Sequence, residues 1–271
     1  MTPTASDRLR HVTSRQNPLV KELRRALERA ETTPDGHVAV ESPRMLEEAI
    51  RSGLRFKAVF FRDSALPRMQ RLLPQISSQA ETLLLPDTVF DSAVTAESPQ
   101  GVAALVRWRP RTLESVLLEG QPLLLVAAGV QDPGNLGTMI RSAEAFGAAA
   151  LLLAPGTVSP LNSKAIRASA GSLFRLPVVP IEYPAALEEL RRREIKLLAT
   201  SSHKGKKLAE ADLTGPVAVF VGNEGAGLPR ELAAEITDSI VIPHSPRVES
   251  LNAGIAASIV LYEAARQRTS R

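Results

Sequence analysis

The stretch VAVFVGNEGAGLP, residues 217–229, joins an apolar run to a loop with three glycines and to a proline suited to opening a helix. A short apolar run without alternation is typical of a strand buried on both faces, as in a parallel sheet. Proline is favoured at the first helical position, where its missing N–H would have no partner. The stretch therefore predicts one strand–loop–helix unit of an α/β domain.

The same unit recurs through the C-terminal part of the chain and predicts a mostly parallel sheet. Ligands of such sheets bind outside the carboxyl ends of the strands, so the loops that follow the strands are where a site is expected. The expected strands cover residues 123–128, 150–154, 177–180, 195–200, 217–221 and 239–242, and the expected helices cover about 135–147, 163–173, 184–193, 229–235 and 252–267.

The N-terminal part predicts a second, smaller α/β domain. Asn17-Pro18 has the form of a helix N-cap followed by proline, and an apolar stripe at helical spacing continues to about Ala30. Prolines 110 and 122 interrupt the pattern, so we expect domains at residues 1–108 and 122–271 with a linker at 109–121. Further expected elements are an extended piece at 37–40, helices at 43–53, 65–78 and after residue 86, and strands at 56–61, 82–85 and 102–108.

The composition is that of an ordinary globular protein. Of 271 residues, 44% are hydrophobic and 23% are charged, with no apolar run of membrane-spanning length and no apolar-cored leader. We therefore expect a soluble, cytoplasmic protein. The chain has no cysteine, which excludes disulfides, thiolate catalysis and thiolate metal sites, and its four histidines are dispersed. We expect no metal.

The net charge of +4 is a weak indication of a nucleic-acid partner. The excess is concentrated before residue 30, where seven basic residues stand against three acidic ones. A run of this kind forms either a solvated helix face or a surface that contacts phosphates. The composition does not decide between the two.

Three loops beside the expected strands carry the polar residues of a candidate site. In the first, Asn135 begins a helix on which Arg141 lies opposite the apolar face; by themselves these residues could be an N-cap and a solvated arginine. The second, residues 222–228, has neither the lysine of a P-loop nor the glycine spacing of a dinucleotide site. Its Glu224 would repel a phosphate but would tolerate a cationic ligand such as a sulfonium.

The third loop, residues 242–252, joins the last strand to the last helix, and Ser250 or Asn252 could cap that helix. The helix is apolar around most of its circumference, with Ile255, Ile259 and Leu261 among its residues. A helix of this kind must be covered on two sides, so we expect a second copy of the chain to pack there.

Taken together and in this order, the three loops resemble the motifs of the SpoU (TrmH-type) family of SPOUT RNA 2′-O-ribose methyltransferases. The first family motif is Asn-x-Gly with an arginine six residues after the asparagine, which Asn135, Gly137 and Arg141 match. The second, Gly-x-Glu-Gly-x-Gly-Leu, matches residues 222–228, and the third, Ile-Pro followed by Ser-Leu-Asn, matches residues 242–243 and 250–252. Three motifs in order are highly specific, and the likeness covers roughly residues 120–268.

The resemblance implies an α/β SPOUT domain with a deep trefoil knot that transfers a methyl group from S-adenosylmethionine to a ribose 2′-hydroxyl of a structured RNA, with 23S ribosomal RNA as the expected target. The apolar last helix belongs to this domain, so the expected homodimer forms through it. The family's cofactor positions correspond to Gly222, Ile242 and Leu251, and its catalytic residues correspond to Asn135, Arg141, Glu224, Ser250 and Asn252. We expect Thr200, at the end of a strand, and Asn223 and Gly225, in the glycine loop, to bind the cofactor in the same pocket.

The family assignment makes Arg141 the residue that helps to deprotonate the ribose. A guanidinium with a pKa above about 12 is a poor base, so we favour a clamp on an RNA phosphate and on the developing alkoxide. The general-base role is the alternative.

The N-terminal part is similar, more loosely, to the L30e/L7Ae-like substrate-binding domain of these enzymes, through residues 13–18 and 46–49. With an RNA substrate implied, the basic run is expected to meet phosphates, which supply most sequence-independent affinity. The expected RNA-binding residues are Arg15, Arg24, Arg25, Arg167 and Arg175.

Two positions depart from the family pattern, and alternatives remain. His244 and Pro246 stand where many members have methionine and glycine; we interpret His244 as packing in the cofactor loop, which Pro246 can reshape because it donates no N–H. The alternatives are a transfer RNA ribose methyltransferase and a non-catalytic RNA-binding protein of the same fold. A nucleotide-dependent enzyme and a serine hydrolase lack their motifs.

Overall fold

A computed structural model describes residues 8–118, 120–223, 225, 227–236 and 238–269. By its internal contacts the chain divides into two compact units. Unit 1 comprises residues 1–109 together with 161–174, and unit 2 comprises residues 110–160 together with 175–271. The segment 161–174 therefore belongs to the second expected domain in sequence but to unit 1 in space. The domain boundaries expected from the sequence stay a prediction.

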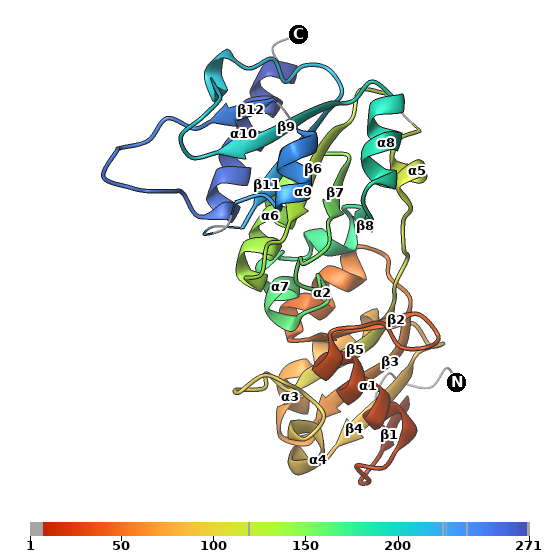
Figure 1. Ribbon diagram of the computed structural model, residues 1–271. Helices are drawn as coiled ribbons and strands as arrows, with labels where there is room; N and C mark the ends of the chain where they lie inside the picture. The colour runs from red at the N-terminus through yellow and green to blue at the C-terminus, as the bar shows by residue number, and fades with distance from the viewer. Residues whose placement is uncertain (1–7, 119, 224, 226, 237, 270–271) are drawn as a thin grey trace. The chain divides into compact units, whose positions relative to one another are not determined.

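Unit 1 is built on a mixed five-stranded sheet in the order β1-β4-β3-β5-β2 (Figure 1). β1, β4 and β3 are parallel neighbours, and β5 runs antiparallel to both β3 and β2. Apolar side chains of the sheet pack with those of the first helix to form the core. The strands are β1 Leu9–His11, β2 His37–Glu41, β3 Phe56–Arg62, β4 Glu81–Leu85 and β5 Val102–Arg107.

The helices of unit 1 begin where their N-caps predict. The Asn17 side chain accepts the N–H of Leu19 at 3.0 Å, and the Ser42 hydroxyl accepts the N–H of Met45 at 3.4 Å. Both expected helix starts are thus confirmed. The helices are α1 Pro18–Arg29, α2 Pro43–Arg51, α3 Leu66–Met69, α4 Asp87–Asp91 and α7 Ser163–Ala168, with 3₁₀ turns at Asp63–Ala65, Gln70–Gln75 and Ser172–Phe174.

Two expected helices are wrong as continuous elements. The helix expected at 65–78 is broken into α3 and two 3₁₀ turns, since Pro74 lies inside it and cannot donate a helical hydrogen bond. The helix expected at 163–173 ends at Ala168, because Ala170 and Gly171 have φ values of 51° and 92°. Those left-handed conformations cannot continue an α-helix.

Unit 2 is built on a seven-stranded sheet in the order β10-β12-β9-β11-β6-β7-β8, and all neighbours are parallel. This confirms the expected α/β class. Every residue of β6 is buried, as expected for a strand covered on both faces. The strands are β6 Leu123–Ala128, β7 Ala150–Leu153, β8 Val178–Pro180, β9 Lys196–Ser201, β10 Lys206–Lys207, β11 Val217–Gly222 and β12 Ser239–Val241.

The helices of unit 2 cover the sheet, and α10 packs against α6 (Figure 1). The loop from β12 to α10, blue in Figure 1, extends outward from the sheet. β1, β10 and α5 were not expected from the sequence. Within the described residues, no helix is both long and apolar enough to cross a membrane. The helices are α5 Leu113–Val116, α6 Pro133–Ala145, α8 Ala185–Arg192, α9 Arg230–Glu235 and α10 Ala253–Thr269, with a 3₁₀ turn at Leu208–Glu210.

Candidate functional site

A cavity of about 580 Å³ opens at the carboxyl ends of β9, β11 and β12 in unit 2. This is where a parallel sheet is expected to bind its ligand. Its walls come from the ends of these strands, from the glycine loop after β11 and from the segment before α10. The six residues assigned to the cofactor from the sequence all line it: Thr200, Gly222, Asn223, Gly225, Ile242 and Leu251.

The glycine loop after β11 is closed by its own backbone. The N–H groups of Asn223 and Gly227 each donate to the other residue's carbonyl oxygen at 2.9 Å. A Cβ added to Gly222 would lie 2.3 Å from the Gly227 carbonyl carbon, which is too close for any side chain. The Asn223 amide also donates to the carbonyl of Gly129, in the loop after β6, at 3.3 Å. Glycine at 222 is therefore a requirement of the cavity wall.

Side chains on the cavity wall are held by neighbouring backbone. The Thr200 hydroxyl donates to the Phe220 carbonyl at 3.1 Å, which joins the ends of β9 and β11. Half-buried His244 has Nδ1 2.7 Å from the carbonyl oxygen of Ile242. This arrangement is consistent with the interpretation of His244 as a packing residue of the loop. Pro246 lies in an exposed turn two residues further on.

Asn135 and Asn252 come together from segments 117 residues apart in the chain. The Asn252 side-chain amide donates to the Asn135 side-chain oxygen at 2.8 Å. Asn252 also accepts the N–H of Ile255 at 3.1 Å, so its predicted capping role is confirmed. Asn135 is not the cap of α6: Asp132 accepts the N–H of Asn135 at 2.8 Å and fills that position. The side chain of Asn135 therefore does not cap the helix and instead accepts the hydrogen bond from Asn252.

Small and hydroxyl side chains hold α6 and α10 in register. Ser142 and Ser258 share a hydrogen bond of 2.7 Å between their hydroxyls. A Cβ on Gly254 would lie 3.1 Å from Cβ of Thr138, which is a tight contact between the helices. These two contacts set the register of the helices, and the asparagine pair lies at their N-terminal ends.

The remaining predicted catalytic residues are partly described. Ser250 lines the cavity beside Leu251. Arg141 is exposed on α6, and among the described residues no side chain or carbonyl pairs with its guanidinium. Glu224 lies outside the described residues. The structure therefore brings Ser250 to the cavity and joins Asn135 to Asn252, while Arg141 is open to a ligand.

Sequence reasoning missed part of the cavity wall. Ser201, Ser202 and His203 follow directly after the expected strand 195–200 and also line the cavity. The signal was available, because residues just after a parallel strand lie at the ligand-binding edge of the sheet.

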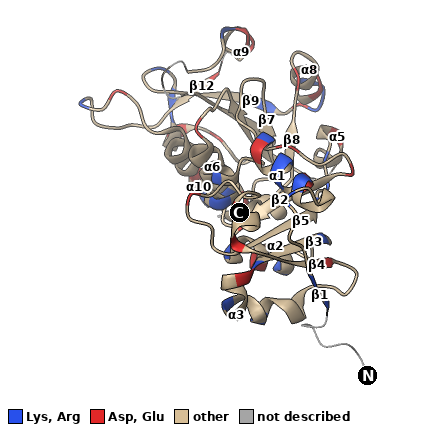
Figure 2. Cartoon of the chain, turned by 90° about the horizontal axis from the view of Figure 1, so that it is seen from below, with Lys and Arg blue, Asp and Glu red and all other residues tan. Residues whose placement is uncertain are grey.

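Two of the predicted RNA-binding arginines at the N-terminus make bonds inside unit 1. Arg24 donates from Nε to the Ser92 carbonyl at 2.7 Å, and Arg15 donates to the Thr88 carbonyl at 3.1 Å. Arg25 is exposed and makes no such bond among the described residues. The helix that carries Arg24 and Arg25 is marked with basic residues in blue in Figure 2.

Arg25 faces a groove of about 720 Å³ in unit 1 together with Lys21 and Arg29. These three residues are spaced four apart on α1, so they form one basic stripe. Glu22 and Glu31 also line the groove. The three basic residues of the stripe outnumber these two acidic residues, so the groove carries a net positive charge.

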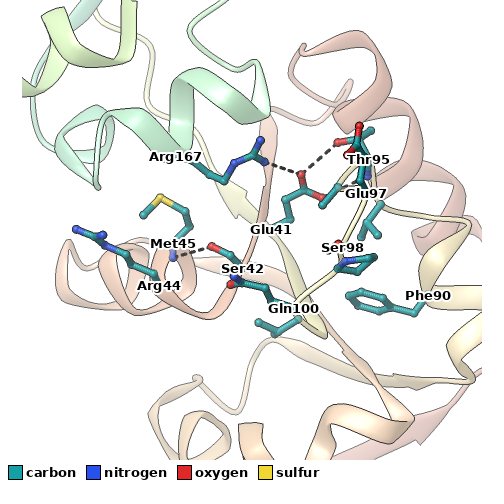
Figure 3. Close-up of a pocket in the computed structure, with 14 residues that line it drawn as sticks. Glu41, Ser42, Arg44, Met45, Phe90, Thr95, Glu97, Ser98, Gln100 and Arg167 are labelled. Atoms are coloured by element: carbon teal, nitrogen blue, oxygen red, sulfur yellow. Dashed lines mark hydrogen bonds and ion pairs between the residues drawn. The ribbon is translucent and has the colours of Figure 1, made fainter. Parts of the chain in front are cut away.

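Arg167 and Arg175, the other predicted RNA contacts, pair with carboxylates. Arg167 lies 3.1 Å from Glu41, which is only 6% exposed and also accepts the Thr95 hydroxyl at 3.2 Å. Figure 3 shows Glu41 between Arg167 and Thr95, in a unit 1 cavity of about 590 Å³. Arg175 donates to Glu144 at 3.0 Å. Both pairs give these arginines a structural role.

A second cluster of unit 1 resembles a metal site by composition. Ligand atoms of Glu22, Asp35 and His37 lie within 4.8 Å of one another. Lys57 Nζ lies 2.6 Å from Glu22 and 2.7 Å from Asp35. Burial raises the pKa of Asp35, but hydrogen bonds from Lys57 and Thr33 outweigh it and lower the pKa overall. The lysine already supplies the positive charge, which argues against a cation there. The expected absence of a metal stays a prediction.

Comparisons with known proteins cover nearly the whole chain. Residues 122–262 match the SpoU rRNA Methylase family, and residues 17–104 match the MRM3-like substrate binding domain. The chain is 31% identical to the 23S rRNA (guanosine(2553)-2′-O)-methyltransferase RlmP of Bacillus subtilis, over 94% of this chain and 98% of that protein. It is 33% identical to an uncharacterized tRNA/rRNA methyltransferase of Synechocystis, over 99% of this chain and 97% of that protein.

Solved structures agree with the sequence relatives. An AdoMet-bound rRNA methyltransferase from Sinorhizobium meliloti superimposes with a TM-score of 0.79 at 28% identity, covering 96% of this chain and 98% of that one. The AdoMet complex of the SpoU methyltransferase AviRb from Streptomyces viridochromogenes gives 0.78 at 28% identity, covering 94% and 100%. With the three loop motifs assembled on a parallel sheet, the chain belongs to the SpoU rRNA methylase family.

Proposed function

We propose that this protein transfers a methyl group from S-adenosylmethionine to a ribose 2′-hydroxyl of 23S ribosomal RNA. One observation carries the proposal: the six residues assigned to the cofactor line a single cavity at the carboxyl ends of the sheet. The relative from Bacillus subtilis, aligned over 98% of its length, is named for this reaction on 23S rRNA.

The cavity fits the proposed cofactor in size and chemistry. Its volume of about 580 Å³ lies within the usual range of small-molecule sites. The glycine loop presents backbone groups at close range, and Ile242 and Leu251 add apolar surface for an adenine ring. When bound, S-adenosylmethionine supplies a methyl carbon made electrophilic by its sulfonium.

The chemical step is an in-line displacement at carbon. The ribose oxygen forms a bond to the methyl carbon, the carbon–sulfur bond breaks with its electron pair on sulfur, and the hydroxyl proton must leave. Positioning supplies much of the rate in such a step. Asn135 and Asn252, fixed by their mutual hydrogen bond, are suited to position the ribose, and Ser250 stands beside the cavity. The resemblance adds Glu224 to this set.

Arg141 has the open guanidinium that the reaction needs. Since a guanidinium with a pKa above about 12 rarely gives up a proton, we assign it to bind an RNA phosphate and to stabilise the developing alkoxide. General-base catalysis is the alternative role. The proton then leaves to solvent or to a neighbouring acceptor as the alkoxide forms.

Replacing Arg141 tests this assignment. We expect Arg141→Ala to lower the methylation rate by about 100- to 1000-fold, as for loss of an oxyanion-stabilising donor. S-adenosylmethionine affinity, measured by equilibrium dialysis, should not change. Arg192→Ala is the matched control, because Arg192 is an exposed arginine of unit 2 that pairs with Glu189 on its own helix. Wild-type turnover of Arg141→Ala on 23S rRNA would contradict the proposal.

The alternative functions make different predictions. A non-catalytic RNA-binding protein of this fold would fail to bind S-adenosylmethionine in equilibrium dialysis. A transfer RNA enzyme would leave 23S rRNA unmodified. Mapping 2′-O-methyl positions in total RNA with and without the protein distinguishes the two RNA targets. We also infer a cytoplasmic location, because the proposed substrate is ribosomal RNA.

We propose that RNA contacts unit 1 through the basic stripe of α1. Arg25 lines an open groove with Lys21 and Arg29, and among the described residues no hydrogen bond or ion pair of its guanidinium is formed. Arg15, Arg24, Arg167 and Arg175 bind internal carbonyls or carboxylates, so we assign them the lesser share of phosphate contacts.

We propose a homodimer through α10. One side of this helix is buried in unit 2, while Ile255, Ile259 and Tyr262 are 52%, 36% and 56% exposed. Their spacing of four and three residues places them on one face, and contiguous exposed apolar residues mark interfaces. We expect Ile259→Glu to convert a dimer to a monomer in sedimentation equilibrium. A wild-type monomer would contradict this part.

Two further features belong to the same proposal. One is the deep trefoil knot implied by the family, and the all-parallel sheet of unit 2 is compatible with it. The functional domains are proposed at residues 1–108 and 122–271, which the family matches at residues 17–104 and 122–262 support.

A further inference from the structure

A lysine-rich loop borders the cavity on the side of β9. We define the lysine loop as residues 201–207, Ser-Ser-His-Lys-Gly-Lys-Lys, which runs from the end of β9 into β10. Its first three residues line the cavity, and Lys204, Lys206 and Lys207 are exposed. The loop therefore carries its positive charge from the cavity wall onto the adjacent surface.

The charge of the lysine loop is uncompensated. The sequence has no acidic residue between Glu194 and Glu210. Among the described residues, no carboxylate lies within ion-pair distance of the three lysines. This contrasts with the arginines at the end of α8, where Arg191, Arg192 and the C-cap residue Arg193 all pair with glutamates. The lysines are thus available to an external anion.

The lysine loop is also held in shape. The Ser201 hydroxyl accepts the N–H of Lys204 at 3.1 Å, and the Ser239 hydroxyl donates to the Lys204 carbonyl at 3.1 Å. Gly205 has a φ of 125°, and a Cβ there would lie 2.5 Å from the Ser239 carbonyl oxygen. The turn is therefore specific to glycine, and β10 then pairs with β12. A fixed turn presents its lysines with less loss of entropy on binding.

We propose that the lysine loop binds phosphates of the RNA substrate beside the nucleotide to be methylated. The inference rests on the proposed function. Lysine ammonium groups bind phosphates as point charges without reading bases, so this contact fixes the position of the RNA and does not select its sequence. Because the same loop forms part of the cavity wall, a strand held there passes close to the bound cofactor.

A structural role for the lysines is the competing explanation. β10 is the outer strand of the sheet, and lysines on outer strands prevent unwanted pairing with other chains. This role accounts for Lys206 and Lys207, which lie on β10. It does not account for Lys204, which precedes the strand. The two roles differ in their effect on RNA binding.

The test replaces all three lysines in the full-length protein with glutamine (K204Q/K206Q/K207Q). The salt slope is the rate at which the logarithm of the RNA association constant falls with the logarithm of the salt concentration. Each phosphate contact adds roughly 0.7 to 0.9 to this slope, so the slope should become smaller by about 2 to 3. We expect affinity for a 23S rRNA transcript to fall by about 10- to 100-fold at 0.15 M salt. S-adenosylmethionine affinity should stay at the wild-type value, and the KM for RNA should rise.

The matched control removes the same charge from the opposite end of β9. K196Q/R191Q/R192Q changes three exposed basic residues of unit 2 at or near the start of that strand. Its salt slope should change by less than one. An unchanged slope in the loop variant, or equal changes in both variants, would overturn the proposal.

The RNA-binding measurement separates this inference from the function itself. If the wild-type protein binds the transcript but methylates no RNA, the proposed function fails while the two salt slopes still decide the role of the loop. If the wild-type protein methylates 23S rRNA and the loop variant keeps the wild-type KM for RNA, only the loop proposal fails.

Discussion

The cavity of unit 2 and the basic stripe of unit 1 are built in different ways. The cavity wall is largely backbone: the closure between Asn223 and Gly227, the close approach at Gly222 and the ends of three hydrogen-bonded strands. The stripe on α1 consists of long side chains whose positions depend on which acceptors lie nearby. A backbone site tolerates little change in shape, whereas a side-chain surface tolerates loss of any one member.

The largest effect is expected at Gly222. In Gly222→Ala the new methyl group would meet the Gly227 carbonyl carbon at 2.3 Å, so the loop must shift. Overpacking of this kind costs about 1–3 kcal/mol, and we expect S-adenosylmethionine affinity to fall by about 10- to 100-fold. Equilibrium dialysis measures this change.

Gly215→Ala is the control for that experiment. A Cβ at Gly215 meets no atom within 4 Å, and this glycine lies before β11, at the other end of the strand. Affinity in the control should equal that of the wild-type protein. Unchanged affinity in Gly222→Ala would mean that the backbone does not define the cavity, and that the cavity is no less tolerant of change than the stripe on α1.

Two neighbouring arginines of α1 give the next effect. Arg25→Ala should weaken RNA binding and lower the salt slope by about 1, with the melting temperature unchanged, because Arg25 is exposed. Arg24→Ala should reduce stability by about 1–2 kcal/mol, since Arg24 donates to the Ser92 carbonyl in a half-buried position. Its salt slope should stay near the wild-type value. These variants carry the same change in charge.

Filter binding over a range of salt and urea unfolding distinguish the two variants. If Arg24→Ala loses RNA affinity as strongly as Arg25→Ala and unfolds normally, both arginines face RNA and the assignment to the groove is wrong. Equal losses of stability in Arg24→Ala and Arg25→Ala would show that the exposure of an arginine on α1 does not predict whether it is available to RNA.

The sequence was sufficient for features that the backbone determines. The bounds of β2 to β9, β11 and β12 were placed within one residue, since apolar runs bounded by glycine and proline have few alternatives. Of the three loops assigned to one site, the second and third contribute residues to one cavity together with Thr200. The first loop is joined to the third by the hydrogen bond between Asn135 and Asn252. The two-residue strand β10 was missed because a pattern of this length carries no periodicity.

Side-chain partners were beyond prediction for a physical reason. Arg167 pairs with Glu41, 126 residues earlier, and Arg175 pairs with Glu144 on α6. Long flexible side chains reach whichever acceptor the tertiary structure brings near, and sequence spacing does not encode that distance. Tertiary packing, which the sequence spacing does not encode, also influences where α7 ends. A Cβ on Gly171 would lie 2.6 Å from Glu48, so packing against α2 requires glycine there and ends the helix.

The smallest effect is expected from an ion pair on α10. Hydrogen bonds from Arg266 and Gln267 lower the pKa of Glu263 from 4.5 to about 2. Since the pKa is lower in the folded state, the pair stabilises the protein above pH 4.5, and this contribution is lost as the pH falls toward 2. Arg266 is 54% exposed, so solvent screening keeps the contribution of this pair small.

Urea unfolding of Glu263→Gln from pH 7 to pH 2 checks this expectation. The difference from the wild-type protein should be greatest at pH 7 and should shrink below pH 4.5, because the wild-type carboxylate is then progressively protonated. Glu235→Gln, which removes the exposed partner of Arg191, is the control for the loss of one carboxylate from an exposed ion pair. A difference for Glu263→Gln that is constant with pH would trace to packing of the side chain, since loss of a charge interaction must follow the titration of the carboxylate.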